Sequence, residues 1–331
     1  MADHDAPGES AEVTWRLDVT TVHGTVVTPR GPGPFPAVVL VAGSGPTDRD
    51  WKSPLLPGSN GSGRLLAEAL ARAGIASLRY DKRASGPQAR ENMQALIGKL
   101  SMQSHVDELT GAVRTLAGQG YVRDDRIFAL TNSEGVLHAL NYQARSPAIP
   151  FAGLVLTGPP GRAVGAVARS QLAAQAAGLS NGEALLALYD AAIARFLAGE
   201  PIAPDPALPQ GVQLLLQSLE TPANLPFARE LWRADAAVLL GQVDVPVLII
   251  IGKKDIQVDW HADGEPLRRA AAGREDVTFL FPEHVNHVLK HEPRPRLALT
   301  PAEVAESYNA PDARLDPQTQ DSILEWLTAH A

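Results

Sequence analysis

The chain has 331 residues, of which 45% are hydrophobic and 20% charged, the balance of a folded protein with a sizeable core. Its formal net charge of -8, without any Lys/Arg-rich block, argues against binding to nucleic acid or to an anionic membrane surface. The sequence contains no cysteine, which excludes disulfides, thiolate nucleophiles and cysteine-ligated zinc. No apolar run reaches the roughly 18 residues of a membrane-spanning helix. Residues 1–10 are acidic and polar, unlike a secretory signal, so we expect a cytoplasmic protein.

The N-terminal region predicts a disordered tail followed by a hairpin. Residues 1–11 form the expected tail. Val, Thr and Leu then alternate over residues 12–20 and 23–28, a pattern typical of two antiparallel strands. After a Pro/Gly-rich stretch, residues 37–42 form a continuous apolar run, Ala-Val-Val-Leu-Val-Ala. Such a run is typical of a strand buried on both faces, and this strand therefore belongs in a parallel sheet.

Strands and helices alternate over most of the remaining chain. We expect strands at 75–80, 126–130, 151–157, 245–251 and 277–281, and helices at 63–73, 101–118, 133–145, after 256 and at 317–330. This alternation predicts an α/β fold with a doubly wound, mostly parallel sheet.

The alternation is interrupted between residues 159 and 243. Ala- and Leu-rich helical patterns cover residues 162–177, 182–198, 212–219 and 225–240. Because the sheet pattern resumes afterwards, we predict a helical cap inserted after the sixth strand into a core formed by residues 12–158 and 244–331. A separate helical domain in tandem is the alternative.

Ser133 is the candidate nucleophile. The strand at 126–130 runs into Thr131-Asn132-Ser133-Glu134-Gly135 and then into a helix, which is the context of a nucleophile elbow. The helix N-terminus would stabilise developing negative charge. The alternative role of Ser133 is a helix N-cap. Thr131 stands where the G-x-S-x-G pattern has its first glycine, which we expect to tighten the turn.

The acid and the base are expected to follow the serine in chain order. Asp255 follows the strand at 245–251 and is the candidate acid, with a helix N-cap as its alternative role and Asp259 as the second choice. His287 is the candidate base, because it lies deep enough in the loop after the strand at 277–281 to reach Ser133.

Other histidines are less suitable as the base. His284 sits close behind its strand and His291 lies just beyond the loop. His105, His138 and His261 fall inside expected helices, where a structural or exposed role is the simpler interpretation.

The predicted reaction is a two-step acyl transfer, in which His287 takes the Ser133 proton and water later hydrolyses the acyl-enzyme. An oxyanion requires two backbone donors. We predict the N–H of Glu134, directly after the nucleophile, and the N–H of Ser44 in the glycine-flanked loop at 43–46.

With these residues in place, the chain resembles bacterial capped esterases of the α/β-hydrolase superfamily. The motifs that carry the resemblance are GSGPTDRD at 43–50, RYDKR at 79–83, TNSEG at 131–135, GKKD at 252–255 and Asn286-His287. The resemblance covers most of residues 12–330 and implies the Ser133, Asp255, His287 triad and a lid of helices. We expect no cofactor. Ala42, Thr131 and Ala84 depart from the usual pattern. The charges of the first two motifs could contact substrate, but ion pairs that brace adjacent loops are the better explanation.

The sequence gives weaker support to several other functions. The glycines at 43 and 45 suggest a dinucleotide site only weakly, because the third glycine is missing. A metal site at His284, His287 and His291 lacks a supporting acidic cluster. Hydrolysis of an amide, a thioester or a carbon–carbon bond, or ligand binding without catalysis, stays open because the fold does not specify the leaving group. The Ala/Leu-rich cap favours small to medium, apolar esters. A homodimer is left open.

Overall fold

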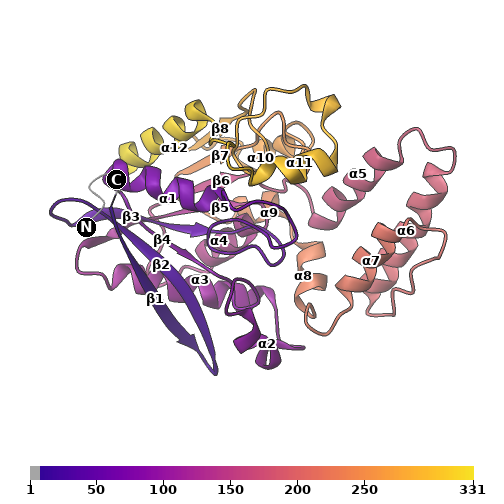
Figure 1. Cartoon of the computed structure of the whole chain (residues 1–331), viewed down its shortest axis with the longest axis horizontal. Coiled ribbons are helices and arrows are strands. Elements are labelled where there is room, and N and C mark those ends of the chain that lie inside the picture. The colour runs from indigo at the N-terminus through magenta and orange to yellow at the C-terminus, as the bar shows by residue number, and fades with distance from the viewer. Residues whose placement is uncertain (1–7) are drawn as a thin grey trace.

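A computed structural model describes residues 8–331, which are built around one eight-stranded sheet (Figure 1). The strand order is β1-β2-β4-β3-β5-β6-β7-β8. The antiparallel pairs are β1 with β2 and β2 with β4, whereas β3 to β8 run parallel. The strand bounds are Gly8–Leu17 for β1, Thr20–Pro29 for β2, Phe35–Val41 for β3, Ala76–Tyr80 for β4, Val122–Asn132 for β5, Gly153–Thr157 for β6, Val247–Ile250 for β7 and Val277–Leu280 for β8. The predicted doubly wound, mostly parallel sheet is confirmed.

The N-terminal hairpin begins earlier than the sequence pattern suggested. Residues 1–7 of the predicted tail lie outside the described part of the chain. Gly8 opposes Pro29 and Ala11 opposes Val26, so the prediction of disorder is wrong for residues 8–11. Edge-strand pairing uses backbone groups, and it therefore does not require the apolar side chains that marked the rest of the hairpin.

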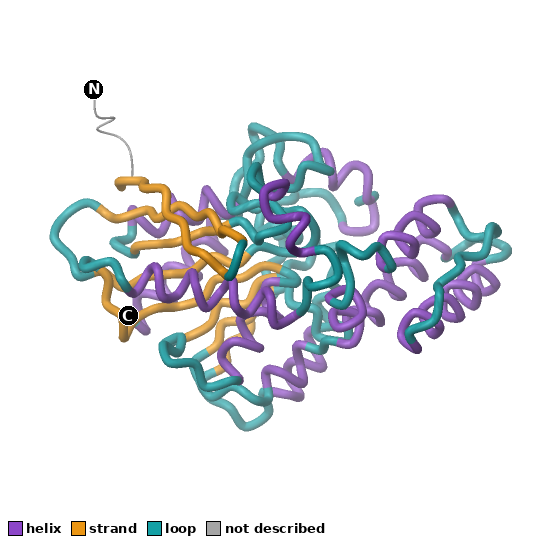
Figure 2. Tube along the Cα trace, turned by 90° about the horizontal axis from the view of Figure 1, so that it is seen from below, coloured by secondary structure: helices purple, strands orange, loops and turns teal. Residues whose placement is uncertain are grey.

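Helices cover both faces of the sheet, as Figures 1 and 2 show. On β3, Val39 and Val41 pack with the cluster that includes α3 (Met102–Ala117) and α4 (Gly135–Ala144). Val38 and Leu40 face the opposite cluster, with α1 (Ser62–Arg72) and α12 (Pro317–His330). Successive side chains of one strand are thus buried on opposite faces, which explains the unbroken apolar run.

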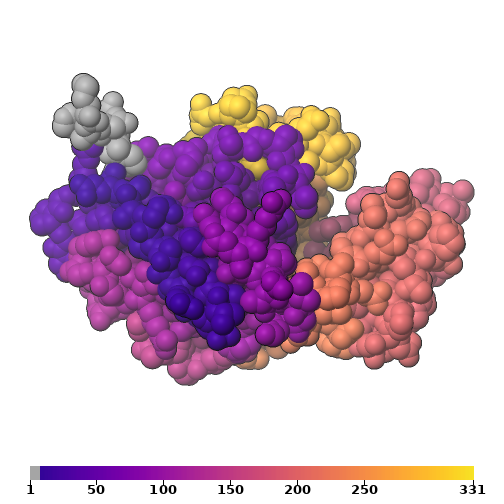
Figure 3. Space-filling view, turned by 60° about the horizontal axis from the view of Figure 1, so that its bottom comes forward, coloured from indigo at the N-terminus to yellow at the C-terminus, as the bar shows by residue number. Residues whose placement is uncertain are grey.

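The chain between β6 and β7 is helical. Its helices are α5 (Val164–Ala176), α6 (Gly182–Ala198), α7 (Gln210–Leu219), α8 (Phe227–Arg233) and α9 (Ala236–Leu240). Helices α5 to α8 form a lobe beside the sheet, visible in salmon in Figure 3. This lobe has its own apolar cluster, which includes Tyr189, Phe196, Leu216 and Trp232.

The expected helix at 225–240 is divided in two. Asp235 interrupts it because its carboxylate accepts hydrogen bonds from the N–H groups of Ala237 and Val238, which starts a new helix. Helix α9 then packs against α4 and α10 (Gly264–Ala270), on a face of the sheet and apart from the cluster of the lobe.

Four other elements differ from the expectation. The helix expected after Ile256 begins only at Gly264, because residues 256–263 form turns. Two short helices, α2 (Ala89–Leu96) and α11 (Pro301–Tyr308), and the 3-10 turn Arg296–Ala298 were not predicted. None of the helices within residues 8–331 combines the length and apolar character that crossing a bilayer requires.

Candidate active site

Ser133 sits in a sharp turn between the last residue of β5, Asn132, and the first residue of α4, Gly135. Its φ of 54° lies in the left-handed region, which is strained for a residue other than glycine. The Ser133 N–H donates to Thr157 O at 2.9 Å and its carbonyl accepts from Val136 N at 3.0 Å. The N-cap position of α4 is Glu134, so the Ser133 side chain does not cap the helix.

Gly135 allows this turn to lie close to β3. A Cβ at this position would lie 2.6 Å from Val41 O and 2.7 Å from Ala42 O. Because both contacts are with backbone, they could be relieved only by moving α4 away from the sheet.

We therefore expect Gly135→Ala to lower the free energy of unfolding by about 1–3 kcal/mol, the usual cost of overpacking a tight site. Urea unfolding followed by circular dichroism measures the change. Gly211→Ala is the control, since a Cβ there meets nothing within 4 Å. Equal stability of the two variants would contradict the close approach of α4 and β3.

Thr131 occupies the position of the missing elbow glycine. It is fully buried, and its Oγ1 donates to Val155 O at 3.2 Å, while its own carbonyl accepts from Thr157 Oγ1 at 2.7 Å. The side chain therefore packs against β6, and the departure from glycine is accommodated within the sheet.

Asp255 and His287 are in direct contact. Asp255 Oδ2 lies 2.7 Å from His287 Nδ1, and both side chains are buried. The other oxygen, Oδ1, accepts from the N–H groups of Gln257 at 2.7 Å and Val258 at 2.9 Å. One carboxylate thus caps the turn that follows it and pairs with the histidine. The alternative role of helix N-cap is wrong, because the next helix begins only at Gly264.

His287 lies in the same cleft as Ser133. Both residues line a cavity of about 340 Å³. The Asn132 side chain donates to His287 O at 2.9 Å, which ties the histidine loop to the elbow. Gly158, with a φ of 55°, passes so close to the imidazole that a Cβ would lie 3.0 Å from its Cε1. The structure therefore brings the three predicted residues together at the C-terminal edge of the sheet.

The two predicted oxyanion donors also border this cleft. Ser44 and Glu134 line a second cavity of about 380 Å³ that contains Ser133. Within residues 8–331, no acceptor is hydrogen-bonded to the N–H of Ser44 or of Glu134. Both groups are thus free to bind an oxygen atom of a substrate.

Comparison with solved structures identifies the architecture. The esterase Pf2001 of Pyrococcus furiosus matches 99% of this chain and 94% of its own, with a TM-score of 0.56 and 16% identity. The match to the proline iminopeptidase of Mycobacterium smegmatis covers 97% of this chain and 98% of the peptidase, with a TM-score of 0.56 and 16% identity. The match to a 2,6-dihydroxy-pseudo-oxynicotine hydrolase covers 98% of this chain and 69% of that hydrolase, with a TM-score of 0.55 and 18% identity. The chain has the α/β-hydrolase fold.

Sequence comparison adds one curated relative. The chain is 30% identical to Esterase EstD of Thermotoga maritima over a match of 276 residues, and this match covers 82% of the chain. The match spans only 59% of the length of EstD. No family model matches the chain.

The rejected candidates lie elsewhere in the α/β-hydrolase fold. Asp259 forms an ion pair with Arg296 at 3.1 Å and is not in contact with His287. The rings of His284 and His291 are 5.4 Å apart, and His291 Nδ1 pairs with Asp316 at 2.9 Å. His261 lies in a turn, which corrects its expected place in a helix.

The charged motifs before the helical lobe form ion pairs. Arg49 binds Asp81 at 2.9 Å, and Arg79 binds Asp50 at 2.8 Å. These pairs join the loop after β3 to the end of β4 and the loop that follows it, which is the bracing role that the sequence favoured.

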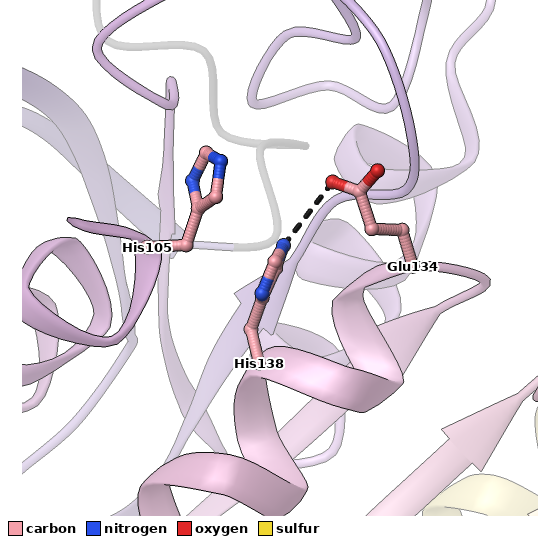
Figure 4. Close-up of side chains that lie close together, drawn as sticks. All are labelled: His105, Glu134 and His138. Atoms are coloured by element: carbon pink, nitrogen blue, oxygen red, sulfur yellow. Dashed lines mark hydrogen bonds and ion pairs between the residues drawn. The ribbon is translucent and has the colours of Figure 1, made fainter. Parts of the chain in front are cut away.

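A buried cluster beneath the elbow was not anticipated from the sequence. Figure 4 shows His105, Glu134 and His138, whose potential metal-ligating atoms lie within 4.8 Å of one another. His138 Nε2 lies 3.1 Å from Glu134 Oε1, and Lys82 Nζ lies 3.3 Å from the same oxygen. Burial alone would raise the pKa of Glu134, but the Lys82 ammonium and the His138 hydrogen bond lower that pKa well below its usual range. The carboxylate is therefore ionised and paired with Lys82.

Burial, followed by the neighbouring His105, lowers the pKa of His138 to about 4 from 6.5. Between these pH values the unfolded chain binds a proton that the folded chain does not. We therefore expect the free energy of unfolding to fall as the pH is lowered from 6.5 to 4, by on the order of 3 kcal/mol from this group. Urea unfolding of the parent and His138→Gln across this range measures the contribution. Identical pH slopes would contradict the assignment.

Proposed function

We infer that this protein is a serine hydrolase that cleaves carboxylic esters through an acyl-enzyme on Ser133. The observation that carries the proposal is the placement of Ser133, at a strained elbow, in the same cleft as a buried His287 whose Nδ1 is bound to Asp255 at 2.7 Å. The similarity to Esterase EstD supports an ester as the substrate class.

In the proposed mechanism, Nε2 of His287 accepts the Ser133 proton as Oγ attacks the ester carbonyl. Asp255 keeps the Nδ1 proton of His287 in place and stabilises the imidazolium. The N–H groups of Ser44 and Glu134 bind the oxyanion. His287 then protonates the leaving alcohol, and in the second step it activates the water that releases the acid.

The cleft divides at Ser133 into two arms. His287 lines the arm of about 340 Å³ together with Leu56 and Tyr308, and it does not line the arm of about 380 Å³. Because His287 must reach the leaving oxygen, we assign the first arm to the alcohol and the second to the acyl group.

The acyl arm is mainly apolar. It lies under α5, α7 and α8, and its lining residues include Val167, Leu219, Phe227, Leu231 and Trp232. Its size and lining fit short to medium acyl chains. On this basis the lobe of α5 to α8 acts as a cap over the sheet, and the substrate is a small, uncharged ester. The cap ends before the predicted boundary at residue 243, because α9 packs with the core. A cytoplasmic location stays a prediction, as does a homodimer.

The test combines a covalent probe with a substrate panel. We expect a fluorophosphonate to label Ser133 alone, as peptide mass mapping would show. We also expect hydrolysis of p-nitrophenyl esters, with kcat/KM rising and then falling as the acyl chain lengthens. Matched thioester and amide substrates form the comparison. Faster turnover of the amide or thioester would replace the ester assignment, and absence of labelling would point to a ligand-binding protein without catalysis.

A further inference from the structure

One buried side chain touches both halves of the proposed oxyanion site. Lys82 is 5% exposed, and its Nζ donates to Gly43 O at 2.6 Å and to Glu134 Oε1 at 3.3 Å. Gly43 lies in the loop after β3, and Glu134 follows the nucleophile. Lys82 does not line either arm of the cleft. It can therefore act on a substrate only through the groups that it holds.

The carbonyl that Lys82 binds belongs to the same peptide unit as the N–H of Ser44. A trans peptide is planar, and its C=O and N–H groups point in opposite directions. The Gly43–Ser44 bond is trans, because the cis bonds of the described chain are Gly33–Pro34 and Leu225–Pro226. Fixing the Gly43 carbonyl toward Lys82 therefore directs the Ser44 N–H away from Lys82 and toward the cleft.

This peptide unit needs an external restraint. Its orientation is set by ψ of Gly43 and φ of Ser44, and Gly43 has no side chain to limit that rotation. The next residue, Gly45, has a φ of 70°, a backbone conformation that favours glycine. A larger residue at position 43 would restrict the rotation but would crowd the elbow. Its Cβ would lie 3.3 Å from both Ser133 Cβ and Asn132 Oδ1. The hydrogen bond from Lys82 is a contact that can hold the carbonyl end of this plane.

Glu134 holds the ammonium group in place. Its Oε1 accepts from Lys82 Nζ at 3.3 Å and lies 3.1 Å from His138 Nε2. Because Nε2 faces a carboxylate, it carries the proton, and this leaves Nδ1 of His138 as an acceptor without a partner in the described part of the chain. Phe227 packs against the rings of His105 and His138, with centroid distances of 4.5 Å and 6.1 Å, which closes the cluster from the side of α8.

We propose that the Lys82–Glu134 ion pair is a positioning device for the oxyanion site, which orients the Gly43–Ser44 peptide so that its N–H meets the substrate oxygen. Glu134 thus contributes twice, with its backbone N–H as one donor and with its side chain as the anchor of the other. The inference rests on the proposed hydrolase function.

A metal ion in the same cluster is the competing interpretation. His105, Glu134 and His138 offer three ligand atoms, and Nε2 of His105 has no hydrogen-bond partner within residues 8–331. However, an added dication would share the Glu134 carboxylate with the Lys82 ammonium, 3.3 Å from Oε1, in a buried site of low dielectric. The repulsion between the two cations favours the ion pair as the resident arrangement.

The first test measures Lys82→Met, combined with Glu134→Gln so that no buried charge is left without a partner. Loss of one oxyanion donor costs about 10²–10³-fold in kcat, and a misoriented donor should cost about 10–100-fold. We expect this fall in kcat with KM changed less than about 3-fold, and an equal loss of affinity for a trifluoromethyl ketone that forms the tetrahedral adduct. Lys82→Arg should recover part of the kcat.

Arg83→Met with Glu108→Gln is the matched control. Arg83 follows Lys82 in the sequence, and its Nε donates to the fully buried Glu108 at 2.8 Å. Neither side chain contacts Gly43 or the elbow. We expect this variant to lose stability and to retain kcat within about 3-fold. If both double variants lose kcat equally, the ion pair is only structural and the proposal is overturned. Stoichiometric zinc in the parent enzyme, lost in Glu134→Gln together with activity, would also overturn it.

A crystallographic readout separates this proposal from the proposed function. We expect crystal structures of the parent and of the Lys82→Met, Glu134→Gln variant to differ by rotation of the Gly43–Ser44 peptide. An unchanged peptide plane would overturn the positioning role even in an active enzyme. If the parent neither hydrolyses esters nor reacts with the phosphonate, the proposed function fails. Rotation of the Gly43–Ser44 peptide in the variant would still show whether Lys82 orients it.

Discussion

Replacement of Ser133 by alanine is expected to reduce ester hydrolysis by at least about 10⁴-fold, because the variant has no oxygen with which to form the acyl-enzyme. Residual turnover would come from the oxyanion donors and from substrate binding alone. The comparison uses kcat/KM for p-nitrophenyl butyrate at pH 6 to 9. The positive φ at this position is strained for alanine as well, so circular dichroism and urea unfolding must accompany the kinetics.

Ser77→Ala is the control for loss of a hydroxyl. Ser77 is buried in β4, and its Oγ has no hydrogen-bond partner among the side chains that the structure describes. We expect its kcat/KM to remain within about 2-fold of the parent. Retention of more than a hundredth of the parent activity by a folded Ser133→Ala protein would mean that another group is the nucleophile.

The second large effect is expected from Asp255→Asn. Oδ1 of Asp255 accepts two backbone N–H groups, those of Gln257 and Val258, so an asparagine must place its own oxygen there. Its NH₂ group then faces Nδ1 of His287, which must become an acceptor. The ring proton moves to Nε2, and the imidazole can no longer accept a proton from Ser133. We expect a loss of about 10⁴-fold in kcat near pH 7.

Asp259→Asn is the matched control for this substitution. Asp259 lies four residues later, accepts from the N–H groups of His261 and Ala262, and pairs with Arg296 away from the histidine. Its kcat should stay within about 3-fold of the parent in the same assay. A mild effect at Asp255 combined with a severe one at Asp259 would reverse the assignment of the acid.

The sequence predicts the parallel sheet and the positions of Ser133, Asp255 and His287 because each rests on a local signal. An apolar run marks each buried strand, and parallel strands bring their carboxyl ends to one edge. The polar residues that follow these strands must therefore lie near one another, even when they are far apart in the chain. Periodicity and turn chemistry suffice for such residues.

The sequence does not predict the partners of Lys82. The motif at 79–83 predicts charges that brace loops, but pairing between Lys82 and Glu134 depends on the order in which β4, β3 and β5 lie side by side. The signal that could have found it is a lysine two residues after a buried strand, together with an acidic residue after the candidate nucleophile. A local pattern also does not reveal that Asp235 starts a new helix, since aspartate is compatible with an exposed helical position.

The long insertion between Thr157 and Val247 has a consequence for how the protein acquires activity. His287 and Asn132 are 155 positions apart in sequence and meet only after β7 and β8 have docked beside β6. Contacts of such long range form late, because closing the intervening loop costs chain entropy before any packing is gained. In a refolding experiment, turnover should therefore return after helical circular dichroism has recovered. The rate at which esterase activity returns would then measure the last step of folding.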